Sequence, residues 1–223
     1  MTTIFLMLIA LVQGDYFTSH AADAKMAMDM FGEYRQELRN VFAGATDEDI
    51  AIAFSIVAPE VSCYDAIMDF VEVSAMRRSY VTNGNCDYSI GYFQMKPSFV
   101  ESLEKEVFRD AALKRKYGSL LAYSQGDDVA TVRRARLSRL CKVEWQIKYL
   151  AIFVDVVKKR TSSWNLRGGE DRVRYWATMY NAGFYLSRAR VEQRQTVKQF
   201  PRGTTEFNYS AVAVEFYRVL LRK

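Results

Sequence analysis

The segment Thr46–Ser62 reads TDEDIAIAFSIVAPEVS and predicts a helix that decides how this chain folds. Thr46 is a suitable N-cap, and the three acidic residues after it lie where the positive end of a helix favours negative charge. Apolar side chains then recur at helical spacing, at Ile50, Ala53, Phe54 and Val57. Because proline lacks the N–H that the next turn needs, we expect the helix to end or kink at Pro59. Glu60 follows directly.

Helical spacing continues along most of the chain, and strand-like alternation is scarce. A first apolar stripe runs from Ala27 to Phe42. Pro97 suits the first position of a further helix, whereas residues 87–95 are expected to be irregular or extended. Other helices are predicted at about 64–80, 127–141, 142–160, 170–180 and 210–221. The predicted fold class is therefore mainly α.

The helix predicted from Tyr64 to Tyr80 has an apolar side and an acidic side. The residues expected to face inward are Tyr64, Ile67, Met68, Val71 and Ala75. The residues expected on the outer face are Asp65, Asp69 and Glu72. The turn signal Asn83-Gly84-Asn85 is expected to close this helix.

Length and composition fit one compact domain. The chain has 223 residues, 50% of them hydrophobic, with only three prolines and no repeat. A formal charge of +5 favours an anionic partner. Four arginines lie in a helix-like segment whose apolar residues Val129, Val132, Leu137 and Leu140 would face inward; they are Arg133, Arg134, Arg136 and Arg139. We interpret them as a solvated helix face and expect no nucleic-acid partner, because no nucleic-acid motif accompanies them.

The first residues, MTTIFLMLIALVQGD, contain an apolar run from Ile4 to Val12. The run is too short to span a bilayer, but it has the length of the central region of a secretory signal. We therefore predict a signal peptide at 1–14, a folded domain at 15–223, and export to the periplasm or cell envelope. The alternative is an N-terminal segment of the core.

The cysteines Cys63, Cys86 and Cys141 match no zinc pattern. In an exported protein a Cys63–Cys86 disulfide is one expectation, and free buried thiols are the other. The one histidine, His20, follows the apparent leader and need not belong to the folded domain. We therefore expect no catalytic set built on histidine, no metal site and no cofactor.

Three segments, far apart in the sequence, carry the functional hypothesis. They are APEVS at 58–62, SIGYFQMKP at 89–97 and ATMYNAG at 177–183. In this order they resemble the motifs of the lytic transglycosylases, which are relatives of goose-type lysozyme. In that family a helix ends in a catalytic Glu, a Gly-Leu-Met-Gln-type segment follows, and an Ala-Tyr-Asn-Ala-Gly-type segment comes later. The resemblance covers roughly Asp47 to Gly183, and extends to the end of the chain if Tyr209 matches the family's late tyrosine. It implies a lysozyme-like, α-rich single domain.

The sequence departs from the family pattern at two points. Val61 stands where Ser commonly follows the catalytic Glu, and Ser62 comes one place later. The stretch between Glu60 and Gly91 is also longer than the compact arrangement of the family, and the helix predicted at 64–80 accounts for the extra length. The chain therefore resembles a divergent branch.

The resemblance implies that Glu60 is the catalytic acid and base. Apolar burial raises the pKa of a carboxyl group, and this allows it to donate a proton near neutral pH. Without the companion motifs, Glu60 would be read as a capping or surface glutamate. The residues expected to bind substrate are Ser62, Gly91, Gln94, Tyr180, Asn181 and Tyr209.

Four of these binding residues also have a chemical reason or a structural alternative. Gly91 would let the backbone approach a sugar closely, and Gln94 offers a donor and an acceptor. Tyr180 can hydrogen-bond the carboxyl group, whereas Asn181 can orient substrate or cap a helix end. Flat faces for sugar rings are expected among Tyr88, Tyr92, Trp176, Phe184 and Tyr185.

The predicted reaction cleaves peptidoglycan glycan strands between N-acetylmuramic acid and N-acetylglucosamine. A lytic transglycosylase needs no second carboxylate, because the 6-hydroxyl of the muramic acid attacks and leaves a 1,6-anhydro end. A hydrolytic muramidase would need one, and Asp87 is the candidate. We prefer the lyase reaction.

Two further alternatives stay open. One is a catalytically inactive glycan-binding envelope protein that retains the fold, and the other is an intracellular helical adaptor that uses the basic helix. For the exported enzyme we expect a monomer, with cell-envelope proteins as partners besides the glycan.

Overall fold

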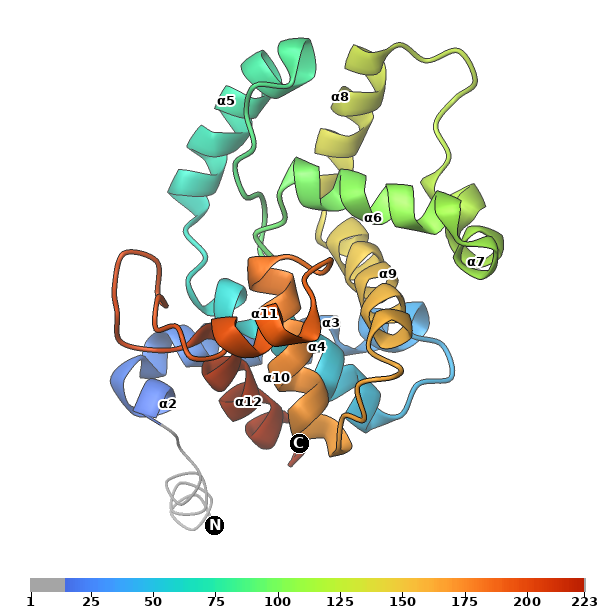
Figure 1. Ribbon diagram of the computed structural model, residues 1–223. Coiled ribbons are helices and arrows are strands. Elements are labelled where there is room, and N and C mark those ends of the chain that lie inside the picture. The colour runs from blue at the N-terminus through green and yellow to red at the C-terminus, as the bar shows by residue number, and fades with distance from the viewer. Residues whose placement is uncertain (1–14, 223) are drawn as a thin grey trace. The chain divides into compact units, whose positions relative to one another are not determined.

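The computed structural model describes residues 15–222, and within them the chain forms eleven α-helices and no sheet (Figure 1). The predicted mainly α fold class is confirmed. The chain divides into two compact units. The first unit comprises the chain up to Cys63 and from Thr161 onward, and the second is Tyr64–Arg160. The predicted signal peptide at 1–14 lies outside the described residues, and the domain boundary stays a prediction.

The helices of each unit are as follows. The described part of the first unit contains α2 (Asp15–Ser19), α3 (Ala21–Val41), α4 (Asp47–Ser62), α10 (Gly168–Ala182), α11 (Arg188–Arg194) and α12 (Tyr209–Leu220). The second unit contains α5 (Ala66–Asn83), α6 (Pro97–Arg109), α7 (Ala111–Leu121), α8 (Val129–Leu140) and α9 (Val143–Arg160).

Helix α4 is the core helix of the first unit. It starts as predicted, with a capping box in which the Thr46 hydroxyl accepts from the Asp49 backbone and the Asp49 carboxylate accepts from the Thr46 backbone. Every residue from Ile50 to Pro59 is buried. The helix packs against α3, α10 and α12. It is therefore apolar on nearly all sides, where the sequence had indicated a single stripe.

The helix does not end at Pro59 but continues to Ser62. Proline removes one backbone hydrogen bond, but the turn after it gains a side-chain bond from the Ser62 hydroxyl to the Pro59 carbonyl at 2.7 Å. The Cys63 N–H also donates to the Glu60 carbonyl at 3.1 Å. Packing around the helix and these two bonds hold the last turn, which carries Glu60.

No single helix between residues 15 and 222 is long and apolar enough to cross a membrane, and α4 and α5 reach that length and hydropathy only as a pair. The burial of α4 inside the first unit is enough to explain why the helix is apolar.

Tyr16, in α2, contacts α4 through its hydroxyl group, which lies 2.7 Å from the Ser62 hydroxyl. Its side chain is fully buried, and its ring stacks on His20 with a centroid distance of 4.7 Å. His20 also contacts Phe207 edge to face. The idea that His20 need not belong to the fold is therefore wrong, because two aromatic rings enclose it.

Helices α10 and α12 pack closely on each other and on α4. The close approach depends on Gly169, since a Cβ atom there would lie 1.8 Å from the Tyr217 hydroxyl oxygen. Tyr217 in turn donates to the Glu48 carboxylate at 2.9 Å. Both helices are thereby positioned against α4.

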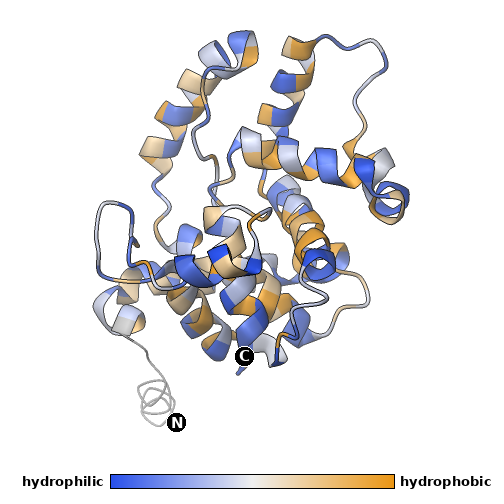
Figure 2. Ribbon diagram, in the orientation of Figure 1, coloured by the Kyte–Doolittle hydropathy of each residue, from blue (hydrophilic) through white to orange (hydrophobic). Residues whose placement is uncertain are grey.

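The second unit confirms several local predictions. Helix α6 begins at Pro97, and α5 closes at Gly84, which has the left-handed conformation with φ 77°. Helix α9 is largely hydrophobic (Figure 2), and its buried residues include Ile147, Leu150 and Phe153.

The inward face predicted for the helix at 64–80 is wrong. Ile67 is 77% exposed, and Met68, Phe70 and Val71 are exposed as well. The buried residues of α5 are instead Met76, Tyr80 and Val81, near its C-terminal end. Apolar residues occur on more than one side of this helix, so their spacing could not identify the buried side.

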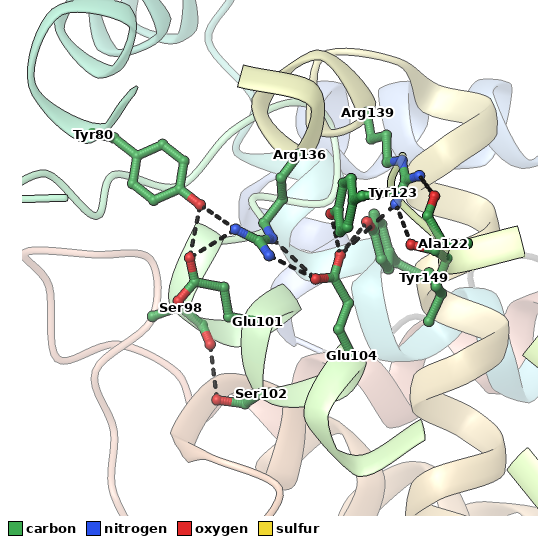
Figure 3. A network of polar contacts seen from close by, with 11 residues as sticks. Tyr80, Ser98, Glu101, Ser102, Glu104, Ala122, Tyr123, Arg136, Arg139 and Tyr149 are labelled. Carbon is green, nitrogen blue, oxygen red and sulfur yellow. Dashed lines mark hydrogen bonds and ion pairs between the residues drawn. The ribbon is translucent and has the colours of Figure 1, made fainter. Parts of the chain in front are cut away.

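The basic helix α8 also differs from its prediction, because Arg136 is buried (Figure 3). Its guanidinium group contacts the Glu104 carboxylate at 2.8 Å and the Glu101 carboxylate at 2.9 Å. Glu104 is buried too, and it accepts hydrogen bonds from the hydroxyl groups of Tyr123 and Tyr149 at 2.7 and 2.9 Å. A buried charge is tolerated when its partners are charged and hydrogen-bonded, which explains this departure from a solvated face.

Some of the other residues of α8 are buried, and others are exposed. Arg139 is largely buried and donates to the carbonyl groups of Leu121 and Ala122, at the end of α7. Arg134 is exposed. Of the apolar residues, Leu137 and Leu140 are buried as predicted, whereas Val129 is 65% exposed.

Replacing Arg136 with methionine is expected to lower the free energy of unfolding by about 3–5 kcal/mol, because Glu104 would stay buried without its cation. Urea denaturation followed by circular dichroism measures this loss. The control is Arg134→Met on the same helix, for which we expect a change within about 0.5 kcal/mol. Equal stability of the two variants would show that the buried pair does not support the unit.

Candidate active site

Glu60 lies in the last turn of α4 and is half-buried, after a run of fully buried residues. Two buried phenols lie near it: Tyr180 at the end of α10 and Tyr209 at the start of α12. The pKa of both phenols is raised well above its ordinary value, first by burial and then by the negative charge of Glu60. The structure thus brings together three of the predicted site residues from three distant segments.

The Tyr209 hydroxyl donates to the Ile56 carbonyl at 3.0 Å. A phenol has one hydrogen, so this bond uses its only donor and leaves the oxygen as an acceptor. Burial and the negative charge of Glu60 raise the pKa of Tyr209, which keeps the phenol neutral near the carboxyl group.

Ser62 supports the end of α4 from inside the protein. It is buried, its hydroxyl donates to the Pro59 carbonyl, and it lies 2.7 Å from the Tyr16 hydroxyl. Because the hydrogen of Ser62 goes to Pro59, Tyr16 must donate to Ser62. The hydroxyl predicted to bind substrate is thus occupied by protein partners. Tyr16 was missed, since a single aromatic residue after an apolar run has no sequence signature.

Asn181 occupies the last turn of α10 and is exposed. The cap of this helix is Gly183, with φ 121° and a backbone N–H that donates to the Met179 carbonyl. Asn181 is therefore not needed as the cap, which leaves its amide available for substrate. It lines a cavity together with Tyr209.

Gly91 and Gln94 belong to the second unit, where they form a tight turn. Ile90 and Met95 pair across the turn through two backbone hydrogen bonds of 3.1 Å. Gly91 has φ 70°, and Gln94 has φ 49° with its side-chain amide donating to the Gly91 carbonyl at 2.8 Å. A Cβ atom on Gly91 would lie 1.6 Å from Nε2 of Gln146. The glycine is thus required by a side chain of the protein itself, and not only by the approach of a sugar.

Two residues that hold this turn were missed by the sequence analysis. Gln146 is buried; its Oε1 accepts from the Phe93 N–H at 2.9 Å, and its Nε2 donates to the Ile90 carbonyl at 3.2 Å. Asp69 accepts from the Gly91 N–H at 2.6 Å, although it was expected on an outer face. An amide among the apolar residues of α9 is a usable signal for Gln146, because buried polar groups need partners. Asp69 offers no comparable signal.

Asp87, the candidate second carboxylate, also lies in the second unit and is exposed. One carboxylate oxygen accepts from the Ser98 N–H at 2.9 Å, and the other accepts from the Ser98 hydroxyl at 2.6 Å. Ser98 is in the first turn of α6, so Asp87 satisfies a free N–H at the positive end of that helix. This role is structural.

The aromatic residues expected to contact sugars fall into two groups. Trp176 and Phe184 are buried and form part of the core. Tyr88, Tyr92 and Tyr185 are exposed, and the rings of Tyr92 and Tyr185 already contact those of Tyr64 and Phe184.

Cys63, Cys86 and Cys141 are free thiols, so the structure contains no Cys63–Cys86 disulfide. Cys63 and Cys141 are exposed, which differs from the buried thiols of the alternative expectation. Between residues 15 and 222, no group of three His, Cys, Asp or Glu side chains is arranged to hold a metal ion.

No family model, no curated protein and no solved structure matches this chain. The geometry of the site and the three motifs are therefore the basis for any functional proposal.

Replacing Gln146 with leucine is expected to lower the free energy of unfolding by about 2–4 kcal/mol, because the Phe93 N–H and the Ile90 carbonyl would lose a buried partner. Urea denaturation gives the loss, and hydrogen exchange should accelerate at the Phe93 amide. Lys158→Ala, an exposed change on the same helix, serves as the control. Unchanged exchange at Phe93 would contradict the assigned role of Gln146.

Tyr209 should make stability fall at high pH. Its pKa is raised in the folded protein above the ordinary value of 10.0, so its stabilising contribution is complete below pH 10 and is lost as the pH rises above it. The stability difference between the native protein and Tyr209→Phe should therefore shrink by about 1.4 kcal/mol from pH 7 to pH 11. Urea denaturation at both pH values tests this. A constant difference would mean that Tyr209 titrates as an exposed phenol does.

Proposed function

We propose that this protein is a peptidoglycan lytic transglycosylase with a lysozyme-like fold, and that Glu60 is its general acid and base. The observation that carries the proposal is the position of Glu60, half-buried at the end of a buried helix and near two buried phenols whose pKa its charge raises. A carboxyl group in such surroundings suits proton transfer near neutral pH. The ordered motifs around Glu60, Gln94 and Tyr180 indicate the substrate class.

The reaction proceeds in two steps. Protonated Glu60 donates its proton to the glycosidic oxygen, and the bond between C1 of N-acetylmuramic acid and that oxygen breaks. The Glu60 carboxylate then takes the proton of the muramic acid 6-hydroxyl while O6 bonds to C1. The products are a 1,6-anhydro end and a new N-acetylglucosamine hydroxyl, and Glu60 is protonated again. This chemistry needs no cofactor.

Tyr209 stays neutral near Glu60 in this scheme, because burial raises its pKa and its hydroxyl hydrogen is held by the Ile56 carbonyl. Tyr180 stays neutral because its pKa is raised. Neither phenol competes with Glu60 for the proton.

The lyase reaction is favoured over hydrolysis by the contacts of Asp87. Hydrolysis requires a second carboxylate that activates water or attacks the sugar. Both oxygens of Asp87 are engaged with Ser98 at the start of α6. The lyase reaction needs only Glu60, so it fits the described contacts better.

The proposal also includes a location and a set of partners. The substrate lies outside the cytoplasm, so the protein would act in the periplasm or cell envelope, with the signal peptide at 1–14 directing export. Its main partner would be the glycan strand, with cell-envelope proteins as further partners, and it would act as a monomer.

The test is digestion of purified peptidoglycan by the native protein and by Glu60→Gln. Glu60→Gln keeps the size of the side chain but cannot transfer the proton, so we expect the rate to fall by about 10³-fold. Release of soluble fragments, followed by chromatography, measures the rate. Circular dichroism should show the same helix content for both proteins.

The control is Glu33→Gln, an exposed glutamate on α3, which should digest at the native rate. Absence of cleavage by the native protein would contradict the enzymatic proposal and favour an inactive glycan-binding protein. Full activity of Glu60→Gln would show that another residue is the acid.

A further inference from the structure

A cavity of about 280 Å³ lies in the first unit. Its lining residues come from the ends of α10 and α11, the segment between α11 and α12, and the start of α12, and Figure 1 shows these elements. Tyr209 lines the cavity, and the charge of Glu60 raises the pKa of this phenol. The cavity and the surroundings of the carboxyl group therefore share one residue.

Three polar side chains that line the cavity have no hydrogen bond or ion pair with any residue between 15 and 222. They are Asn181 from α10, Arg194 from the end of α11, and Gln199 from the following segment. All three residues are exposed to solvent. A few polar groups in a concave surface are typical of a ligand site, and here they comprise one cation and two amides.

The other walls of the cavity are fixed by the protein. Asn208 caps α12 by accepting from the Ala211 N–H, and its amide donates to the Val197 carbonyl at 2.7 Å. The Thr178 hydroxyl donates to the Arg174 carbonyl at 2.7 Å. These bonds hold the shape of the cavity and leave Asn181, Arg194 and Gln199 for a ligand.

The chemistry of these groups defines the ligand. A guanidinium group binds carboxylates well, and amides pair with the acetamido and hydroxyl groups of amino sugars. The volume is close to the lower limit of about 300 Å³ for small-ligand sites, so it suits one sugar residue with a short substituent. A carboxylate can form an ion pair with Arg194 that a neutral sugar cannot form.

We propose that this cavity binds a carboxylate-bearing amino sugar, with Arg194 contacting the carboxylate and Asn181 and Gln199 contacting the sugar. The inference rests on the proposed function, since that function brings such sugars to Glu60. The carboxylate can belong to the lactyl group of N-acetylmuramic acid or to the peptide attached to it. Arg194 is then the residue that distinguishes muramic acid from N-acetylglucosamine.

The test measures binding of three sugars to the full protein by NMR titration. N-acetylmuramic acid has a free lactyl carboxylate, muramyl dipeptide has its carboxylate on the peptide, and N-acetylglucosamine has none. We expect at least one acidic sugar to bind about tenfold more tightly than N-acetylglucosamine, a ratio typical of one charge-assisted hydrogen bond. The sugar that shows the preference identifies the source of the carboxylate.

Arg194→Gln should remove this preference and leave the affinity for N-acetylglucosamine unchanged. Arg190→Gln is the matched control, because Arg190 lies on the same helix and does not line the cavity. Equal binding of all three sugars by the native protein, no binding of any, or a preference that persists in Arg194→Gln would overturn the inference.

These outcomes are independent of catalysis. If the native protein does not cleave peptidoglycan but binds acidic sugars through Arg194, the proposed reaction fails and the binding site stands. If it cleaves peptidoglycan and Arg194→Gln binds as the native protein does, the site fails and the reaction stands.

Discussion

Burial of α4 on nearly every side is the constraint on which the first unit depends. Ten consecutive buried residues, Ile50 to Pro59, precede Glu60, which is the first residue of the helix after Ile50 to reach the surface. The helices that cover α4 include α10 and α12, and these carry Tyr180 and Tyr209. The packing that stabilises the helix therefore also brings the two phenols to the carboxyl group.

The second unit depends instead on buried polar side chains that are paired with hydrogen-bond or charged partners. Gln146 fixes a turn through bonds to Phe93 and Ile90, and Glu104 joins α6 to α8 through Arg136. Burying such a group without partners costs free energy, so each of these side chains strongly favours the arrangement in which it is paired. The turn that contains Gly91 and Gln94 is held in this way before any substrate binds.

The sequence was sufficient for the local elements and for part of the site. Capping and proline chemistry predicted the starts of α4 and α6, and helical spacing predicted most of the longer helices. The motifs identified Glu60 and Tyr180, and Tyr209 was expected separately among the substrate-binding residues; the fold brings all three together. These features depend on neighbours in the sequence or on short patterns, and a single sequence contains both.

The predictions that proved wrong concern residues whose contacts come from distant segments of the chain. Arg136 is buried because Glu104 and Tyr80 reach it, and nothing in its own helix indicates this. Ile67 was expected to face inward but is exposed. The prediction failed because the spacing of apolar residues does not say which side of a helix will be covered. Gln146 and Tyr16 have roles that only the folded chain defines.

The central claim is that Glu60 cleaves the glycan without a second carboxylate and without water. The most direct test is digestion of peptidoglycan by the native protein in water enriched in oxygen-18, with the fragments analysed by mass spectrometry. The account predicts 1,6-anhydro ends that contain no oxygen-18. Reducing ends that carry oxygen-18 would contradict it and indicate a hydrolase.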